Sequence, residues 1–185
     1  MENYYRVQIE PETRIAPNAT VVGDVRLGKD VTVLFNATLR SEHGSRIVVG
    51  DRANVQENCC VHLNFGCTCT VGEGTIVGHG AILHGCTVGD NTLIGMGAIV
   101  MDDAVIGNNC MLAAGALIPR GMEVPDGMLA VGSPAKIRRP LTADEIEHIR
   151  VDAADYVMTG KELAENGIIY TGSNLPTDLM TIAIR

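Results

Sequence analysis

A chain of 185 residues is ordinarily a single domain, and it is long enough to bury a substantial core. Its formal net charge of -8 argues against a nucleic-acid or anionic-membrane partner, because phosphate binding needs clustered basic side chains. No apolar run reaches the roughly 18 residues of a membrane span, and the N-terminus lacks the basic and apolar regions of a signal peptide. We therefore expect a cytoplasmic protein that binds neither nucleic acid nor membrane.

An aliphatic residue recurs every six positions along most of the chain, from about residue 13 to residue 120. A helix repeats every 3.6 residues and a single strand every two, so this period indicates short strands joined by tight turns. Turn residues stand where such corners are expected, as at Gly23-Asp24 and Gly50-Asp51. The spacing therefore predicts a parallel β-helix whose inward column contains Ile15, Val21, Leu27, Val33, Leu39, Val49, Val55, Val61, Val71, Val77, Leu83, Val88, Ile94, Val100, Ile106, Leu112 and Ile118.

A second inward column is predicted four residues after each aliphatic position, where small or β-branched side chains predominate. It includes Cys59, Thr87 and Cys110, and we expect both cysteines to be core residues. Cys67 and Cys69 follow a break in the repeat. We expect them on a short loop that seals the coil, with metal binding as the alternative.

The repeat resembles that of the hexapeptide-repeat proteins, and so does the stretch from Met122 to Pro140 with its Gly-Ser-Pro-Ala-Lys at residues 132–136. The resemblance implies a mainly β fold, namely a left-handed parallel β-helix with three hexapeptides in each coil. We assign residues 1–140 to this β-helix domain.

The C-terminal part of the chain predicts an α-helix and a tail. Thr142 and Glu145 form a Thr-x-x-Glu capping box, which opens an amphipathic run to about Ala164. A helix of this length can lie against the side of the coil. We assign residues 141–168 to the helix and residues 169–185 to a tail. The apolar end of the tail, Leu179 to Ile184, could pair with another chain.

The repeat also predicts which polar residues stack. With three repeats in each coil, residues three repeats apart lie above one another, separated by about 4.8 Å. Arg40, His62 and His84 each follow an aliphatic residue, and these aliphatic residues are three repeats apart when each ten-residue step counts as one repeat. We therefore expect the three side chains to form one column outside one corner.

His79 falls one repeat earlier in the cycle, on the neighbouring corner with Gln56. His62 and His84 can share a metal ion, because imidazole nitrogens lie about 2.0 Å from Zn²⁺. A threefold assembly would bring His79 of one subunit to this pair on the next. We therefore predict a homotrimer with metal sites between subunits. The two remaining histidines are expected at the surface: His43 and His148.

The segments around these histidines resemble, in order, the signature segments of the γ-class carbonic anhydrases. They are Arg40-Ser41-Glu42, Asn54-Val55-Gln56-Glu57, His62, Gly78-His79 and His84-Gly85-Cys86, within a similarity that runs from about residue 15 to residue 141. Glu42 and Glu57 replace aspartates of the family pattern, and Ser41 replaces a glycine. The loop after His62 carries no acid, whereas some members have a proton-carrying glutamate there.

The resemblance implies a homotrimer in which His62, His79 and His84 hold zinc between subunits. Its implied reaction is the reversible hydration of CO₂ to bicarbonate by a metal-bound hydroxide. Fe²⁺ or Co²⁺ would also suit three imidazoles.

The resemblance also implies roles for the polar residues near the metal. Gln56 would orient the hydroxide, and Asn54 would hold Gln56 in place. Arg40 would pair with an acid across the subunit contact, either Glu42 or Glu57. The alternative for these two acids is an interface ion pair with no catalytic part. In the absence of an acid on the loop, protons would leave by Glu57, buffer or water.

Two other functions fit the same coil. A hexapeptide acyltransferase would use one histidine as a general base and bind coenzyme A between subunits. Such an enzyme has no need to stack His84 on His62. A trimeric scaffold without catalytic activity is the third reading.

Overall fold

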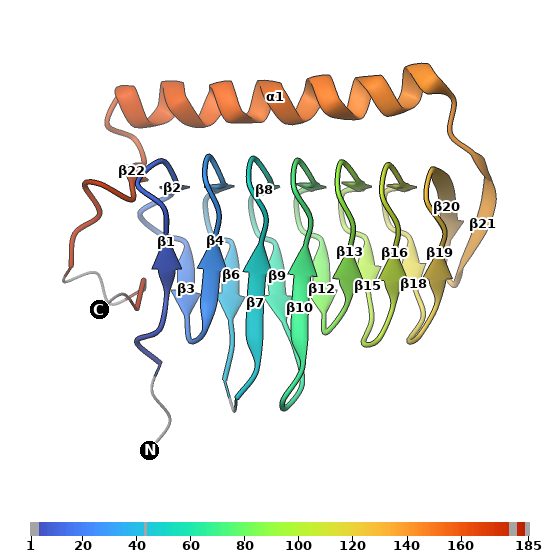
Figure 1. Ribbon diagram of the computed structural model, residues 1–185, viewed down its shortest axis with the longest axis horizontal. Coiled ribbons are helices and arrows are strands. Elements are labelled where there is room, and N and C mark those ends of the chain that lie inside the picture. The colour runs from blue at the N-terminus through green and yellow to red at the C-terminus, as the bar shows by residue number, and fades with distance from the viewer. Residues whose placement is uncertain (1–3, 43, 178–180, 184–185) are drawn as a thin grey trace.

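The computed structural model describes residues 4–42, 44–177 and 181–183. It is a β-helix with one long helix lying along one side (Figure 1). The predicted mainly β, left-handed parallel β-helix with a C-terminal helix is confirmed. His43, one of the two histidines predicted at the surface, lies outside the described residues, while His148 is exposed on the helix.

Three sheets form the walls of the coil, and the chain passes through them in the order sheet 1, sheet 2, sheet 3. Sheet 1 contains β1 (Gln8–Ile9), β4 (Val25–Leu27), β7 (Arg46–Val49), β10 (Thr68–Val71), β13 (Thr87–Val88), β16 (Val105–Ile106) and β19 (Glu123–Val124). Sheet 2 contains β2 (Arg14–Ile15), β5 (Thr32–Val33), β8 (Asn54–Val55), β11 (Ile76–Val77), β14 (Leu93–Ile94), β17 (Met111–Leu112), β20 (Met128–Gly132), β21 (Ala135–Pro140) and β22 (Tyr170–Thr171). Sheet 3 contains β3 (Thr20–Val22), β6 (Thr38–Arg40), β9 (Cys60–His62), β12 (Ile82–His84), β15 (Ile99–Val100) and β18 (Leu117–Ile118).

The predicted aliphatic column fills the interior of the coil. Val55, Val77 and Ile94 stack in register along sheet 2 and are fully buried. Small side chains occupy the tight corners, including Cys59 and Cys110 as predicted. This core is narrow because each coil contributes only a few inward side chains.

Two predictions were wrong: the inward position of Thr87 and the loop position of Cys69. Thr87 is exposed, and Cys86 takes the inward place, because the repeat here has five residues instead of six. Cys69 is not on a loop: it lies in β10, paired in register with the inward Ile47, and is fully buried. Cys67 remains partly exposed outside the strand. The two thiols are therefore divided between the core and the surface.

The two ends of the coil are closed by different means. At the C-terminal end β21 folds back antiparallel onto β20. At the N-terminal end β22 pairs antiparallel with β2, and Ile182 bridges to Val21. Ile182 and Ala183 are buried there. The described part of the tail thus covers the first coil of its own chain. Leu179, Met180 and Ile184 lie outside the described residues, and pairing of this end with another chain stays untested.

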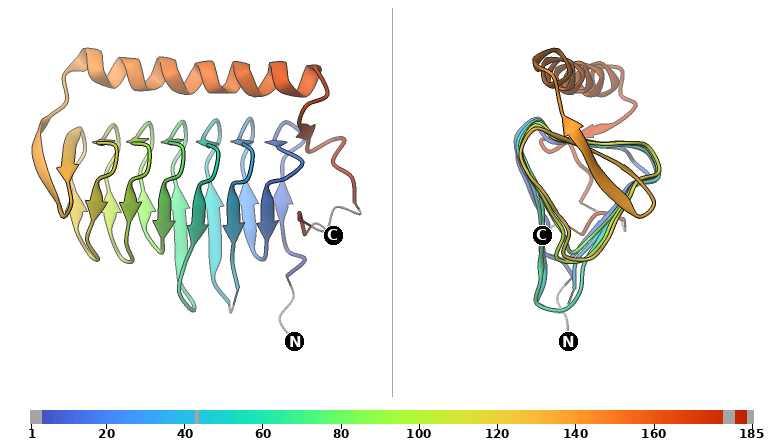
Figure 2. Two further views of the ribbon diagram at one scale, coloured as in Figure 1. Left: turned by 180° about the vertical axis from the view of Figure 1, so that it is seen from behind. Right: turned by 90° about the vertical axis from the view of Figure 1, so that its right-hand side faces the viewer.

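The helix α1 (Ala143–Glu165) runs along the outside of sheet 2 (Figures 1 and 2). The predicted capping box is present, with the Thr142 side chain and the Glu145 side chain each accepting a backbone N–H of the other residue. Ile149 and Ala153 pack against sheet 2 beside Ile76. Among the described residues, no helix has the length and apolar character needed to cross a membrane.

Gly160 lets α1 approach the first coils closely, and its replacement by alanine should destabilise the protein. A Cβ there would collide with Thr32 Oγ1 and lie 3.1 Å from Arg14 Cδ. Alanine normally stabilises a helix by about 1 kcal/mol relative to glycine. We expect overpacking to outweigh this gain, lowering the free energy of unfolding by about 1–3 kcal/mol in denaturant titrations. The exposed neighbour substitution Thr159→Ala should leave stability unchanged or slightly raised.

Candidate metal centre

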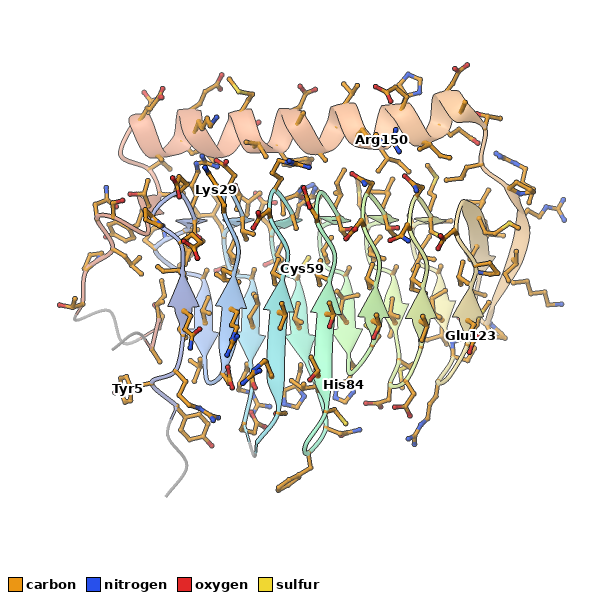
Figure 3. The ribbon with its side chains drawn as sticks, in the orientation of Figure 1. Tyr5, Lys29, Cys59, His84, Glu123 and Arg150 are labelled. Carbon is orange, nitrogen blue, oxygen red and sulfur yellow. The ribbon has the colours of Figure 1, made fainter. Side chains whose placement is uncertain are left out.

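His62 and His84 stack on adjacent coils at the corner where sheet 3 leads into sheet 1. They are paired in register between β9 and β12, as predicted. His62 Nδ1 lies 3.1 Å from His84 Nε2, and the ring centroids are 5.1 Å apart. His84 lies at the side of the coil remote from α1 (Figure 3). Both imidazoles are partly exposed, so the pair is accessible from outside the coil.

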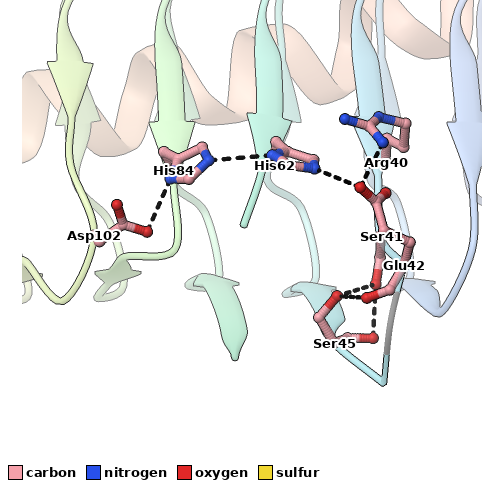
Figure 4. Close-up of polar contacts among 7 residues, drawn as sticks. All are labelled: Arg40, Ser41, Glu42, Ser45, His62, His84 and Asp102. Carbon is pink, nitrogen blue, oxygen red and sulfur yellow. Dashed lines mark hydrogen bonds and ion pairs between the residues drawn. The ribbon is translucent and has the colours of Figure 1, made fainter. Parts of the chain in front are cut away.

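A carboxylate holds the outer nitrogen of each imidazole (Figure 4). His62 Nε2 lies 3.1 Å from Glu42 Oε1, and His84 Nδ1 lies 2.8 Å from Asp102 Oδ1. An ionised carboxylate only accepts hydrogen bonds, so each imidazole donates its N–H outward. When both rings are neutral, the two inner nitrogens therefore present lone pairs to each other. A metal ion between the two nitrogens would relieve this repulsion.

The inner nitrogens also fit a divalent metal with imidazole ligands. Two nitrogens each 2.0–2.1 Å from a tetrahedral zinc ion lie about 3.3 Å apart, close to the 3.1 Å found here. A carboxylate behind a ligating histidine fixes its tautomer and raises its basicity. Glu42 and Asp102 occupy that position for the two rings.

Asp102 is a site residue that the sequence analysis missed. It accepts hydrogen bonds from His84 and, at 2.8 Å, from Asn64 Nδ2 on the loop after β9. The sequence contains a signal for Asp102. Leu83 pairs with Val100, so Met101 follows His84 in the corner column, and Asp102 is the next residue. Following the repeat one coil beyond His84 would have identified this carboxylate.

Arg40 and Glu42 complete the column at this corner. Arg40 Nη1 lies 2.5 Å from Glu42 Oε1, which is one of the two acids predicted for it, within the same chain. Burial raises the pKa of Glu42, but the hydrogen bond from His62 and the charge of Arg40 outweigh it and bring the pKa below its usual value. Glu42 is therefore ionised at neutral pH and can accept from His62. Pairing of Arg40 across a subunit contact stays a prediction.

The structure does not bring His79 together with His62 and His84. His79 lies on the turn between β11 and β12, at the corner between sheets 2 and 3, and its Nδ1 is 2.7 Å from Glu57 Oε2. Sheet 3 separates this corner from the other two histidines. Among the described residues of one chain, no three His, Cys, Asp or Glu side chains converge to hold a metal ion.

Gln56 and Asn54 lie with His79, at the corner between sheets 2 and 3. Gln56 Nε2 donates to Asn54 Oδ1 at 3.1 Å, and the His79 backbone N–H donates to Gln56 Oε1 at 3.2 Å. Tyr156 of α1, which the sequence analysis did not identify, lines the same cavity as Gln56. Its pKa is raised by burial and by the charges of Glu57 and Asp152. Gln56 is thus held in one orientation.

Several buried polar atoms at these two corners lack a hydrogen-bond partner. They are Glu42 Oε2, Asn54 Nδ2 and Glu57 Oε2, of which the last is within ion-pair distance of His79 but not in hydrogen-bonding geometry. Buried polar groups are nearly always satisfied in native proteins. Both corners therefore carry unused hydrogen-bonding capacity that a ligand or a second chain can satisfy.

Comparisons with known proteins show the family to which the chain belongs. Residues 85–120 match the family model described as bacterial transferase hexapeptide (six repeats). Gamma carbonic anhydrase 2 of Arabidopsis thaliana, a mitochondrial protein, is 36% identical over 80% of this chain, which spans 55% of that relative's length. A probable carbonic anhydrase of Methanocaldococcus jannaschii is 38% identical over 84% of this chain and 97% of its own. The chain belongs to the γ-carbonic anhydrase-like family of hexapeptide-repeat proteins.

A solved structure carries a different functional name. A hexapeptide transferase family protein from Anaplasma phagocytophilum superposes with a TM-score of 0.81 at 38% identity, covering 84% of this chain and 92% of that one. The chain spans only about half the length of the Arabidopsis relative. The comparisons therefore show the family and not one reaction.

Proposed function

We propose that three copies of the chain surround a threefold axis with sheet 3 of each facing the axis. In a closed ring each subunit uses two different surfaces, so one corner of a subunit contacts the other corner of the next. The two corners that border sheet 3 carry His79 on one side and the His62–His84 pair on the other. The outward side chains of sheet 3 support this packing, because Ile82 is 39% exposed and Ile99 and Leu117 are partly exposed.

We propose that His62 and His84 of one subunit and His79 of the next hold a divalent metal ion, with zinc as the first choice and Fe²⁺ or Co²⁺ as alternatives. Such an ion, when bound, supplies the Lewis acidity that makes water a nucleophile near neutral pH. Asp102 and Glu42 orient the two stacked imidazoles through their outer nitrogens.

The remaining residues of the site serve the reversible hydration of CO₂ to bicarbonate, which we propose as the reaction. Gln56 positions the reacting water through its side-chain amide, and Asn54 keeps that amide oriented. Glu57, beside His79, accepts the proton that the reacting water releases and passes it to solvent. Arg40 holds Glu42 in place. The reaction would take place in the cytoplasm, as the sequence predicts.

The observation that carries this proposal is the pair of facing imidazole nitrogens, with a third histidine across sheet 3. The test is CO₂ hydration by stopped flow on protein whose metal content has been measured. We expect about one metal ion per chain and activity that is lost on chelation and restored by zinc. Full metal loading without CO₂ hydration would reject the reaction, and a protein that binds no metal would reject the site.

The second candidate function is acyl transfer, which the similarity to a hexapeptide transferase family protein favours. It needs one histidine as a general base and does not need metal. Transfer of an acetyl group from acetyl coenzyme A to an amine or hydroxyl by metal-free protein would establish it. A protein that forms trimers without either activity would be a scaffold.

A further inference from the structure

A groove lies between α1 and the corner that carries His79. Its volume is about 320 Å³, and its walls are formed mainly by apolar side chains, including Leu93, Met96, Met111 and Ala114. Gln56 and Gly78 also line it, and Gly78 directly precedes His79 on the turn between β11 and β12. Tyr156 forms part of the helix side. Within one chain this surface is mainly apolar, with Asp152 of α1 also lining it, and it lies next to the turn that carries His79.

The opposite corner of the coil carries an exposed aromatic side chain. The loops that follow β6 and β9 extend further from the coil than the other turns of this corner (Figure 2, right). Phe65 stands at the tip of the second loop and is 74% exposed. The tip is ordered by contacts of its own, because Asn64 donates to Asp102 and the Cys67 backbone N–H donates to Asn64 O at 3.3 Å. Residues 63–70 carry no charge.

The proposed trimer brings these two features together, and the inference rests on that assembly. His79 of one subunit must reach the His62–His84 pair of the next. The corner of the second subunit that carries the Phe65 loop must then lie against the corner of the first subunit that carries His79 and the groove. The loop projects beyond its own corner, away from its own coil, and therefore passes over sheet 2 of the neighbour, where α1 lies. Asn64 is tied to the coil of Asp102, one coil beyond His84. The tip therefore lies at the level of the coil that supplies Leu93 and Met96 to the groove.

We infer that Phe65 of each subunit inserts into the groove beneath α1 of the next subunit. A phenyl ring fits a groove of this volume, and aromatic side chains gain much from burial at interfaces. The loop carries no charge, so it can be buried against apolar side chains. An acidic loop could not, because burying an unpaired charge costs free energy. Phe65 then closes the metal centre on the side of Gln56 and joins α1 of one subunit to the coil of another.

The chain contains no tryptophan, so Phe65→Trp introduces a single fluorescent reporter at the loop tip. In the full-length protein we expect its emission at shorter wavelength, and its quenching by acrylamide several-fold weaker, than for Ile168→Trp. Ile168 is 50% exposed and lies outside the groove and the loop, so it is the matched control. Sedimentation equilibrium on the same samples shows whether the protein is a trimer or a monomer.

A second substitution places a charge in the groove. Met96 is 61% exposed, so Met96→Glu should be tolerated in the fold. Combined with Phe65→Trp, it should return the tryptophan emission and quenching towards those of the control. Two results with a trimeric protein overturn the inference and leave the proposed function standing. One is a tryptophan at position 65 that is as exposed as the control. The other is a tryptophan that stays shielded when Met96→Glu is also present. A monomer overturns both the inference and the proposed function.

Discussion

The His84→Ala protein should fold and assemble but bind almost no metal, and its rate of CO₂ hydration should fall at least about 1,000-fold, equivalent to about 4 kcal/mol. His84 provides one of the two facing nitrogens, and its loss leaves His62 without a partner at 3.1 Å. The measurement is metal content per chain together with stopped-flow hydration. His148→Ala removes an exposed histidine of α1 and should change neither quantity.

Retention of about one metal ion per chain by the His84→Ala protein would show that the stacked pair is not the metal site. Loss of metal with unchanged hydration would instead separate the metal from the reaction. Circular dichroism and sedimentation on the same samples exclude unfolding as the cause of either result.

Asp102→Asn should weaken metal binding about 10- to 100-fold while leaving the stacked histidines in place. The substitution keeps the size of the side chain but replaces the charged acceptor of the His84 Nδ1–H bond, at 2.8 Å. The affinity is measured by competition with a chromophoric chelator at fixed pH.

Asp103→Asn is the matched control for this measurement. Asp103 is the next residue in the chain, but its carboxylate pairs with Arg120 at 2.7 Å on the surface. It should bind metal as tightly as the unmodified protein. Equal affinities for both variants would mean that Asp102 has no part in holding the metal.

The stacking of the two histidines could be predicted from the sequence because it depends only on the period of the repeat. Short strands joined by tight turns leave little freedom in register, and a shift would move the aliphatic column out of the core. The capping box of α1 is equally local, since Thr142 and Glu145 lie within one turn. These features need no information about distant parts of the chain.

Other features depend on contacts that the repeat does not encode. The closure of the first coil by Ile182 joins the two ends of the chain. The five-residue step before Val88 shifts the inward position from Thr87 to Cys86, and a rule based on six residues fails there. Tyr156 lines the same cavity as Gln56 only because α1 lies over that corner. The first and the last depend on how the chain folds back over the coil, and the second depends on an irregularity of the repeat itself.

The central claim, that each metal centre is shared between two chains, is tested most directly by mixing two inactive variants. His79→Ala and His84→Ala chains should each bind almost no zinc alone. The two kinds of chain are mixed 1:1 and allowed to exchange subunits. A site is intact when its His79 comes from a His84→Ala chain and its His62–His84 pair comes from a His79→Ala chain. Each of these has a chance of about one half, so about one quarter of the sites should recover zinc and activity. A mixture that exchanges subunits yet recovers neither would contradict the shared site.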